Sequence, residues 1–515
     1  MTGAPKIRDR TWIALLAFGL VAVLGVFARP VLPVDETRYL AVAWETWLHG
    51  NWLVPRLNGA PYAHKPPLLF WLINLVWSMT GVSDIPARLV APAAGFASIW
   101  ATSRLARALW PGDPGIGGRA AMILAGTSVF TLYAGLTMFD TLLGLAVLGG
   151  VFAILRGGQT RRGWIGLGVA LAAGGIAKGP VILIHLLPVA LAAPLWAGIP
   201  ARRMLTGLGL AIATGVALIA LWLVPAAVLG GPEYRAAVLW TQTAGRVSSS
   251  LGHARPWWFF LPLVPALLWP FGWSPTLWRR LAGLAPRTDR SLRLPLIWAG
   301  SALVLFSIVS GKQAHYLVPT LPAVALILAR AAGETRFPAR LAAAPLVVIG
   351  LACLGAALGL VGGDAAILLR PRLLAALIGL GFLGCAWLAW RLRGTDLLWV
   401  GLLPLVLVNL LFLYGAPGRI YDPVPIASFI APADGAGIAV LGDEYNGEFT
   451  FAARLRNPVA TLTPDAAGAW LAADPGRVLV ARRDRPAPAG EPAFGVVYRG
   501  HPYGVWRGSQ ASAAK

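Results

Sequence analysis

Ionisable and aromatic side chains that could do chemistry are concentrated in a few short segments of this 515-residue chain, and long apolar stretches separate them. Lysine and arginine can hold a phosphate group, and aspartate can act as general base for an acceptor hydroxyl. A phosphate leaving group held by cations needs little acid assistance, because its developing charge is already compensated. A sugar linked to a lipid phosphate fits such a site. The candidate catalytic residues are Asp35, Asp140 and Glu36. The candidate substrate-binding residues are Arg38, Tyr39, Tyr62, His64, Lys65, Lys178, Arg246, Arg255, Lys312, His315 and Tyr316.

The elements that must position these residues are membrane helices. Only 12% of the residues are charged and 57% are hydrophobic, whereas a soluble protein carries about 25% charged residues. A helix that spans the hydrocarbon core needs about 20 mostly apolar residues. The sequence therefore predicts a polytopic α-helical membrane protein. We expect about thirteen transmembrane helices, near residues 11–29, 87–109, 119–138, 141–156, 163–177, 179–198, 204–229, 257–277, 294–310, 316–332, 341–362, 371–390 and 396–415.

The positions of the arginines predict the orientation of the chain. The formal net charge is +22, but the basic residues are spread over short loops, which favours the positive-inside rule over nucleic-acid binding. With an uncleaved first helix and a cytoplasmic N-terminus, every predicted inner loop contains arginine. Counting the short apolar segment 66–81 as a further span would place those loops outside, so we expect an interfacial helix there.

The candidate residues then fall on the outer side of the membrane. We expect a transmembrane domain over 1–415, whose first outer loop, 30–86, contains interfacial helices. The tail, 416–515, differs in composition and predicts a small periplasmic α/β domain, because apolar runs alternate with Gly, Pro and Asp. Its expected elements cover 437–441, 449–455, 466–472, 477–481 and 494–498.

Four motifs carry a resemblance to a known family. They are Pro33–Tyr39 (PVDETRY), Asn58–Leu68 (NGAPYAHKPPL), Lys178-Gly179-Pro180 and Lys312–Pro319 (KQAHYLVP). In this order they resemble the aminoarabinose transferase (ArnT) and protein O-mannosyltransferase group of GT-C glycosyltransferases, over most of the chain. The chain departs from that pattern at His64, where aminoarabinose transferases commonly place glutamate before Lys-Pro-Pro.

The resemblance implies an inverting glycosyltransferase of the bacterial inner membrane. Its donor would be a sugar on a polyprenyl phosphate, usually undecaprenyl phosphate, and its acceptor lipid A, another glycan or a protein at the periplasmic face. The resemblance also implies that Asp35 is catalytic and that Asp140 matches the second acidic position. Lys65, Tyr316 and an arginine of the loop 230–256, Arg255 in preference to Arg246, would hold the donor phosphate.

Simpler interpretations of single residues stay open. Asp35 and Asp140 could only begin helices, and Lys65 and Lys178 could be interfacial lysines. Glu36 could pair with a neighbouring arginine or complement a helix dipole.

Three histidines predicted on the outer side, His64, His253 and His315, could hold a divalent metal ion, although no tight ligand spacing supports a metal site. The cysteines Cys353 and Cys385 lie in apolar spans and are expected to be unpaired.

The alternative function for the whole chain is a transporter or flippase of lipid-linked substrates. It predicts internal repeats and charges at the middle of the membrane. The sequence shows neither feature.

Overall fold

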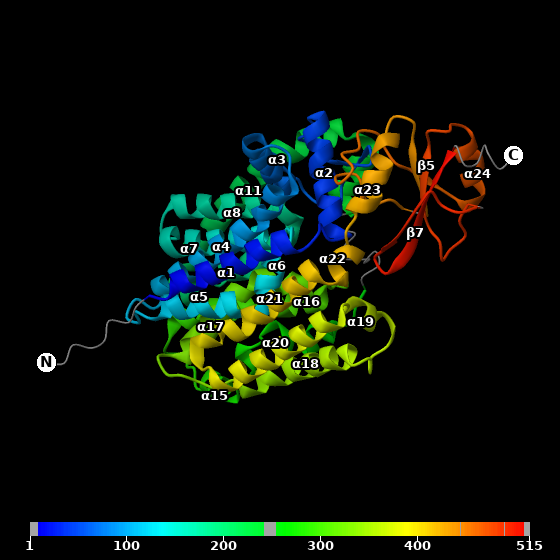
Figure 1. Ribbon diagram of the computed structural model, residues 1–515. Helices are drawn as coiled ribbons and strands as arrows, with labels where there is room; N and C mark the ends of the chain where they lie inside the picture. Colours follow the sequence, from blue (N-terminus) through cyan, green and yellow to red (C-terminus); the bar gives the residue numbers. More distant parts are fainter. Residues whose placement is uncertain (1–8, 242–253, 443, 489, 509–515) are drawn as a thin grey trace.

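The computed structural model describes residues 9–241, 254–442, 444–488 and 490–508. A bundle of helices forms most of the molecule, and a small domain with a β-sheet (orange to red) follows it in the chain and lies beside α2 (Figure 1). This arrangement agrees with the predicted polytopic membrane protein and its C-terminal α/β domain.

The bundle consists of long apolar helices. Within the described ranges, nine segments are long and apolar enough to cross a membrane, and a tenth is formed by α5 and α6, which meet at a bend of 70°. The helices of the bundle are α1 (Thr11–Ala28), α4 (Asp84–Leu109), α5 (Ile116–Gly126), α6 (Ser128–Ala134), α7 (Asp140–Gly157), α8 (Arg161–Lys178), α9 (Ile182–Leu191), α10 (Ala193–Trp196), α11 (Ala201–Leu229), α14 (Val264–Leu267), α15 (Pro275–Ala282), α16 (Arg293–Ile308), α17 (Leu321–Ala332), α18 (Ala343–Ala357), α20 (Arg372–Arg391) and α21 (Leu398–Tyr414).

One apolar segment, Arg161–Leu191, contains the two helices α8 and α9. At the end of α8, Lys178 contacts Asp140 at the start of α7. The chain then returns along α7, because Leu186 packs on Gly150 and Ile199 packs on Gly158. The contacts therefore support the two separate spans that the sequence predicts here.

Two further segments connect the same two ends of the bundle. Arg88, near the start of α4, donates to the Val26 carbonyl at the end of α1, whereas Arg107, near the end of α4, contacts Asp9 before α1. The run from Arg255 to Arg280 likewise begins beside Ser310 and ends beside Ala332. Within the described residues, the chain thus runs between the two ends of the bundle more often than the nine or ten apolar spans alone indicate, and the count of thirteen membrane crossings stays a prediction.

The first loop folds over one end of the bundle, which we call the α2 end. It contains α2 (Asp35–His49), a two-residue hairpin of β1 (Arg56–Leu57) and β2 (Ala60–Pro61), and α3 (Leu68–Thr80). With 13 residues, α3 is a short apolar helix, in agreement with the prediction that segment 66–81 does not span the membrane. Shorter helices elsewhere are α12 (Gly231–Ala236), α19 (Gly363–Leu368), α22 (Ala416–Ile420) and α23 (Val424–Ile430).

The C-terminal domain is a five-stranded mixed sheet in the order β4-β3-β5-β7-β6. The parallel strands β3, β4 and β5 are joined in part by α24, and β6 and β7 form an antiparallel hairpin. The elements are β3 (Ile438–Leu441), β4 (Ala460–Leu462), α24 (Pro464–Ala472), β5 (Val478–Arg482), β6 (Phe494–Tyr498) and β7 (His501–Arg507).

The expected element at 449–455 is wrong, because this segment forms consecutive turns that contact the first loop. The Leu455 carbonyl accepts a hydrogen bond from the Trp44 indole at 2.8 Å, and Phe451 stacks on Trp77 with ring centroids 5.5 Å apart. Asn58 adds two hydrogen bonds to the backbone of Val459, at 2.7 and 2.8 Å. The C-terminal tail therefore packs on the first loop, which contains the Pro33–Tyr39 motif.

Candidate functional site

Asp35 begins α2 and has an exposed side chain. One turn later, the Tyr39 hydroxyl donates to Asp35 Oδ1 at 3.1 Å. Tyr39 is 2% exposed and packs on Phe139. Burial, reinforced by the negative charge of Asp35, raises the pKa of Tyr39 well above its ordinary value, so the phenol remains a hydrogen-bond donor. Asp35 is thus oriented by a buried tyrosine while it stays accessible.

Asp140 begins α7 and forms a buried ion pair with Lys178 from the end of α8. The two side chains are 2% and 9% exposed. The Lys178 ammonium also lies 5.0 Å from the centre of the Tyr316 ring. A buried pair of this kind keeps its charges only because each side chain neutralises the other.

His315 and Lys65 connect this pair to the first loop. His315 interacts electrostatically with Asp140, Lys178, Lys65 and Asp35. Its ring lies 5.0 Å from that of Tyr316, and the Lys65 ammonium lies 5.9 Å from the centre of the Phe139 ring. The structure therefore brings all four motifs together at the α2 end.

The other candidates of the first loop border this cluster. Tyr62 is buried against Phe70, and its ring lies 5.3 Å from that of the exposed His64. Arg38 interacts electrostatically with Tyr39 and with Glu448 of the tail. Arg38 thus faces the junction between the first loop and the C-terminal domain.

Arg255 and Lys312 lie together, on two segments that pair at one β-bridge. Lys312 is 3% exposed, and its ammonium donates to the Arg255 carbonyl at 3.0 Å. The exposed Arg255 side chain lies 6.0 Å from the centre of the Phe259 ring, and within the described residues no contact joins it to Asp35 or Asp140. Two other candidates, Arg246 and His253, lie outside the described residues.

Glu36 is 3% exposed, and three donors occupy its carboxylate. Oε1 accepts from the backbone and hydroxyl of Thr137, both at 2.9 Å, and Oε2 accepts from the backbone N–H of Leu32 at 3.1 Å. These contacts are typical of a residue that positions the backbone. The catalytic role that the sequence suggested for Glu36 stays a prediction.

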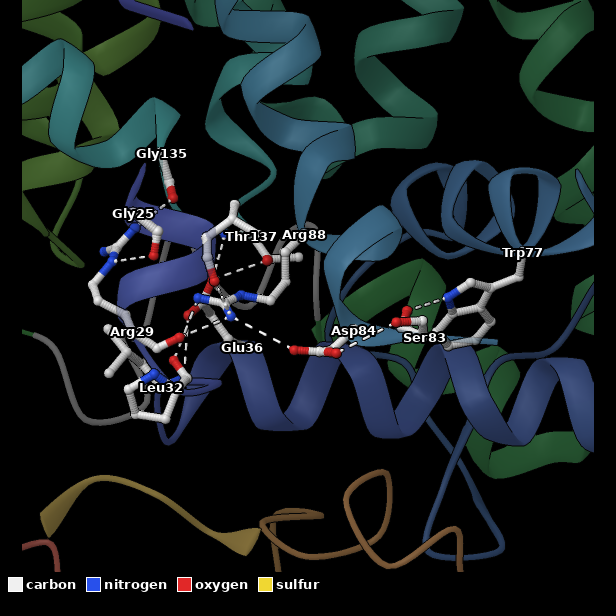
Figure 2. Close-up of polar contacts among 12 residues, drawn as sticks. Gly25, Arg29, Leu32, Glu36, Trp77, Ser83, Asp84, Arg88, Gly135 and Thr137 are labelled. Atoms are coloured by element: carbon white, nitrogen blue, oxygen red, sulfur yellow. Dashed lines mark hydrogen bonds and ion pairs between the residues drawn. The ribbon is translucent and has the colours of Figure 1, made fainter. Parts of the chain in front are cut away.

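Three residues of this region escaped the sequence reasoning: Thr137, Arg29 and Arg88. The arginines are 7% and 2% exposed and bind backbone carbonyls around Glu36 (Figure 2). A charged residue at the end of or inside an apolar helix is costly unless it is used, and this was the signal for Arg29 and Arg88. Thr137 offered no such signal.

Metal binding stays a prediction. Among the residues that the structure describes, no group of three or more His, Cys, Asp or Glu side chains converges as metal ligands would. His64 and His315 lie at the α2 end, but they contact aromatic rings there. The two cysteines are buried and unpaired, as expected.

Comparison with known proteins supports the resemblance seen in the motifs. The family described as dolichyl-phosphate-mannose-protein mannosyltransferase matches residues 64–269. An undecaprenyl phosphate-alpha-4-amino-4-deoxy-L-arabinose arabinosyl transferase of Pseudomonas fluorescens is 32% identical over 331 residues, which cover 61% of this chain and 56% of the relative. The transferase of the same name from Pseudomonas aeruginosa is 28% identical, over 63% of this chain and 60% of the relative. The chain thus spans less than two thirds of the length of either relative.

Solved structures agree in fold. ArnT from Cupriavidus metallidurans in the apo state superimposes with a TM-score of 0.70 at 19% identity, over 97% of this chain and 98% of that protein. The same protein bound to undecaprenyl phosphate gives 0.68 at 20% identity, over 92% and 93%. The chain therefore has the ArnT fold, a multi-pass GT-C membrane architecture, and the predicted resemblance is confirmed.

Proposed function

We propose that this chain is a membrane glycosyltransferase that moves one sugar from undecaprenyl phosphate to an acceptor hydroxyl at the α2 end. The matched relatives are named for a 4-amino-4-deoxy-L-arabinose donor, which is the first sugar to test. Lipid A, another glycan and a protein are the candidate acceptors. We place the α2 end at the periplasmic face of the bacterial inner membrane, with the N-terminus in the cytoplasm.

The observation that carries this proposal is the convergence at the α2 end. An accessible carboxylate, Asp35, faces a cluster of cations and a buried acid, Asp140, at the edge of an apolar bundle. A polyprenyl chain can lie along the apolar helices while its phosphate reaches the cations. The acceptor can approach from the aqueous side, where Asp35 is exposed.

The residues suggest how the transfer would proceed. The acceptor oxygen attacks the anomeric carbon, and the bond from that carbon to the phosphate oxygen breaks on the opposite side, which inverts the configuration. The acceptor proton passes to Asp35, acting as general base. The electron pair of the broken bond remains on polyprenyl phosphate, whose charge Lys65, Arg255 and Tyr316 would hold.

Asp140 would act differently from Asp35, because its carboxylate is already paired with Lys178. The pair fixes the ammonium beside Tyr316, where it would add positive potential next to the departing phosphate. No step of this scheme needs a metal ion, and a divalent cation at His64 or His315 would be an addition to it.

The direct test uses purified protein in lipid nanodiscs with undecaprenyl phosphate-linked 4-amino-4-deoxy-L-arabinose and lipid A. We expect the wild type to release undecaprenyl phosphate and add one sugar to the acceptor, detected by mass spectrometry. The anomeric configuration of the product, read by NMR, tests inversion. Asp35→Asn removes the base but keeps the shape of the side chain, so we expect transfer to fall at least about a hundredfold.

Asp364→Asn is the matched control, because Asp364 is an exposed acid in α19, away from the cluster. It should transfer at the wild-type rate. Full activity of Asp35→Asn would refute the assignment of the base. Hydrolysis of the donor without acceptor modification would point to another acceptor, and glycan and protein acceptors would be tried next.

A further inference from the structure

We infer that Glu36 and Thr137 form a positioning device that sets the distance between Asp35 and the Asp140–Lys178 pair. This inference rests on the proposed function, because it concerns the geometry of the transfer site. Glu36 follows Asp35 directly in the first turn of α2. Thr137 lies three residues before Asp140, in the turn between α6 and α7.

The link between these two segments is short and double. Glu36 Oε1 accepts from both the Thr137 hydroxyl and the Thr137 N–H, at 2.9 Å each. Oε2 accepts from the Leu32 N–H at 3.1 Å, which closes the chain turn just before α2. One carboxylate therefore joins the turn that presents Asp35 to the turn that presents Asp140.

Two buried arginines, Arg29 and Arg88, lie next to this link and hold the segments around it (Figure 2). Arg29 donates to the Gly135 carbonyl at 2.8 Å, so it holds the same turn as Thr137. Arg88 donates to the carbonyls of Val26 and Arg29 at 2.9 Å each, so α4 holds the end of α1. The Thr137 turn and the end of α1 before Glu36 are thus each held by a guanidinium group.

Glu36 is also the buried counter-charge of this region. Arg29 interacts electrostatically with Glu36, and Arg88 adds a second positive charge beside Arg29. The other nearby acid, Asp84, is 42% exposed and lies 3.7 Å from Arg88. Because charge-assisted hydrogen bonds are stronger and more directional than neutral ones, the carboxylate holds the Thr137 turn more firmly than an amide would.

A displacement of about 1 Å between reacting groups can cost about a hundredfold in rate. Asp35 and Asp140 sit on different elements, α2 and α7, and their relative position depends on the contacts between those elements. Weakening the Glu36–Thr137 link should therefore lower kcat, while the binding of the donor phosphate by Lys65 and Tyr316 stays intact.

The test compares threonine variants that differ by one hydroxyl. Thr137→Val keeps the shape and the backbone hydrogen bond to Glu36 but removes the side-chain donor, and we expect kcat to fall on the order of tenfold with the donor KM within about twofold. Thr137→Ser restores a hydroxyl and should recover kcat to within about twofold of the wild type. Glu36→Gln, which removes the charge, should lose more activity than Thr137→Val.

Thr131→Val is the matched control. Thr131 is 2% exposed in α6, and its hydroxyl donates to the Ala125 carbonyl at 2.6 Å. Thr131→Val therefore also removes one buried hydroxyl hydrogen bond, but this bond does not involve Glu36. This variant should keep the wild-type kcat. If Glu36→Gln fails to fold, the threonine variants still decide the matter.

The possible results separate the inference from the proposed function. A wild type that transfers sugar to none of the candidate acceptors would refute the function itself, and an active Asp35→Asn variant would refute the assignment of the base. If the wild type is active and Asp35→Asn is not, then equal kcat values for Thr137→Val and Thr131→Val would overturn the positioning role. A fall in kcat that Thr137→Ser does not recover would overturn it as well.

Discussion

Removing Lys178 alone should destabilise the protein more than removing both partners of the buried Asp140–Lys178 pair. In Lys178→Met the Asp140 carboxylate, 2% exposed, loses the ammonium that it contacts. Breaking a buried ion pair costs about 3–5 kcal/mol. Lys65 also interacts with Asp140 and supplies part of the missing charge. We therefore expect the lower end of that range, about 3 kcal/mol.

The reverse change should cost less. In Asp140→Asn the Lys178 ammonium is 9% exposed, keeps an amide oxygen as acceptor, and remains 5.0 Å from the centre of the Tyr316 ring. A cation over an aromatic ring gains about 1–2 kcal/mol when desolvated, so we expect a loss of about 2 kcal/mol. The double variant leaves no buried charge unpaired, and its loss should also be about 2 kcal/mol, which makes the coupling energy about 3 kcal/mol.

Unfolding by SDS in mixed micelles, monitored by tryptophan fluorescence, measures these free energies for all four proteins. The exposed Arg483–Glu491 pair, whose side chains are 45% and 86% exposed, gives the matched control cycle. Its coupling should lie below about 1 kcal/mol. Additive single losses at Asp140 and Lys178 would refute the reasoning, because they would show that the two charges do not neutralise each other.

Three further predictions concern the junction with the tail. Phe451→Ala removes a ring that is 4% exposed and stacked on Trp77, so it should cost about 3 kcal/mol and make the tail sensitive to protease. Asn58 has φ 55° and two hydrogen bonds to Val459. Asn58→Gly should lose only the stability that the two hydrogen bonds to Val459 provide. Asn58→Ala should lower the free energy of unfolding by about 1 kcal/mol more, because alanine is strained at this positive φ.

The third of these predictions is a pH dependence. Burial raises the pKa of Glu448 above 4.5, although backbone N–H groups, Arg499 and Arg38 oppose the shift. A raised folded-state pKa means that stability is lost as the pH rises from 4.5 through the folded value. Glu448→Gln removes this loss of stability. The unfolding temperature of the variant minus that of the wild type should therefore increase between about pH 4 and about pH 8. A constant difference would contradict the shift.

The sequence predicted the parts of the fold that depend on composition. The apolar spans and their arginine-bearing loops placed every motif on one side of the membrane, which is why the order of residues along the chain was enough to group Asp35, Lys65 and Lys178. The pairing of Lys178 with Asp140 was out of reach, because it depends on which helices are neighbours. The hydrogen bond between Glu36 and Thr137 could not be predicted either, because the two residues are 101 positions apart in the sequence.

The tail shows a second reason for failure. Segment 449–455 has the apolar residues of a strand, yet its backbone turns to meet Trp44. Strand β7 was missed because Pro502 and Gly504 interrupt its pattern, whereas its pairing with β5 and β6 supplies the order. In both places the environment overrides the local preference of the chain.

The hydrogen bond from Trp44 to Leu455 joins residues that are 411 positions apart. At a synthesis rate of about 5–20 residues per second, the first loop is complete roughly 20–80 s before the segment that covers it emerges from the ribosome. During that interval every helix of the bundle is inserted while α2 lacks its cover. The first loop is therefore covered last. A nascent chain that stops short of residue 455 has its membrane helices and the Glu36–Thr137 link, but it lacks the contact that covers α2 at Trp44.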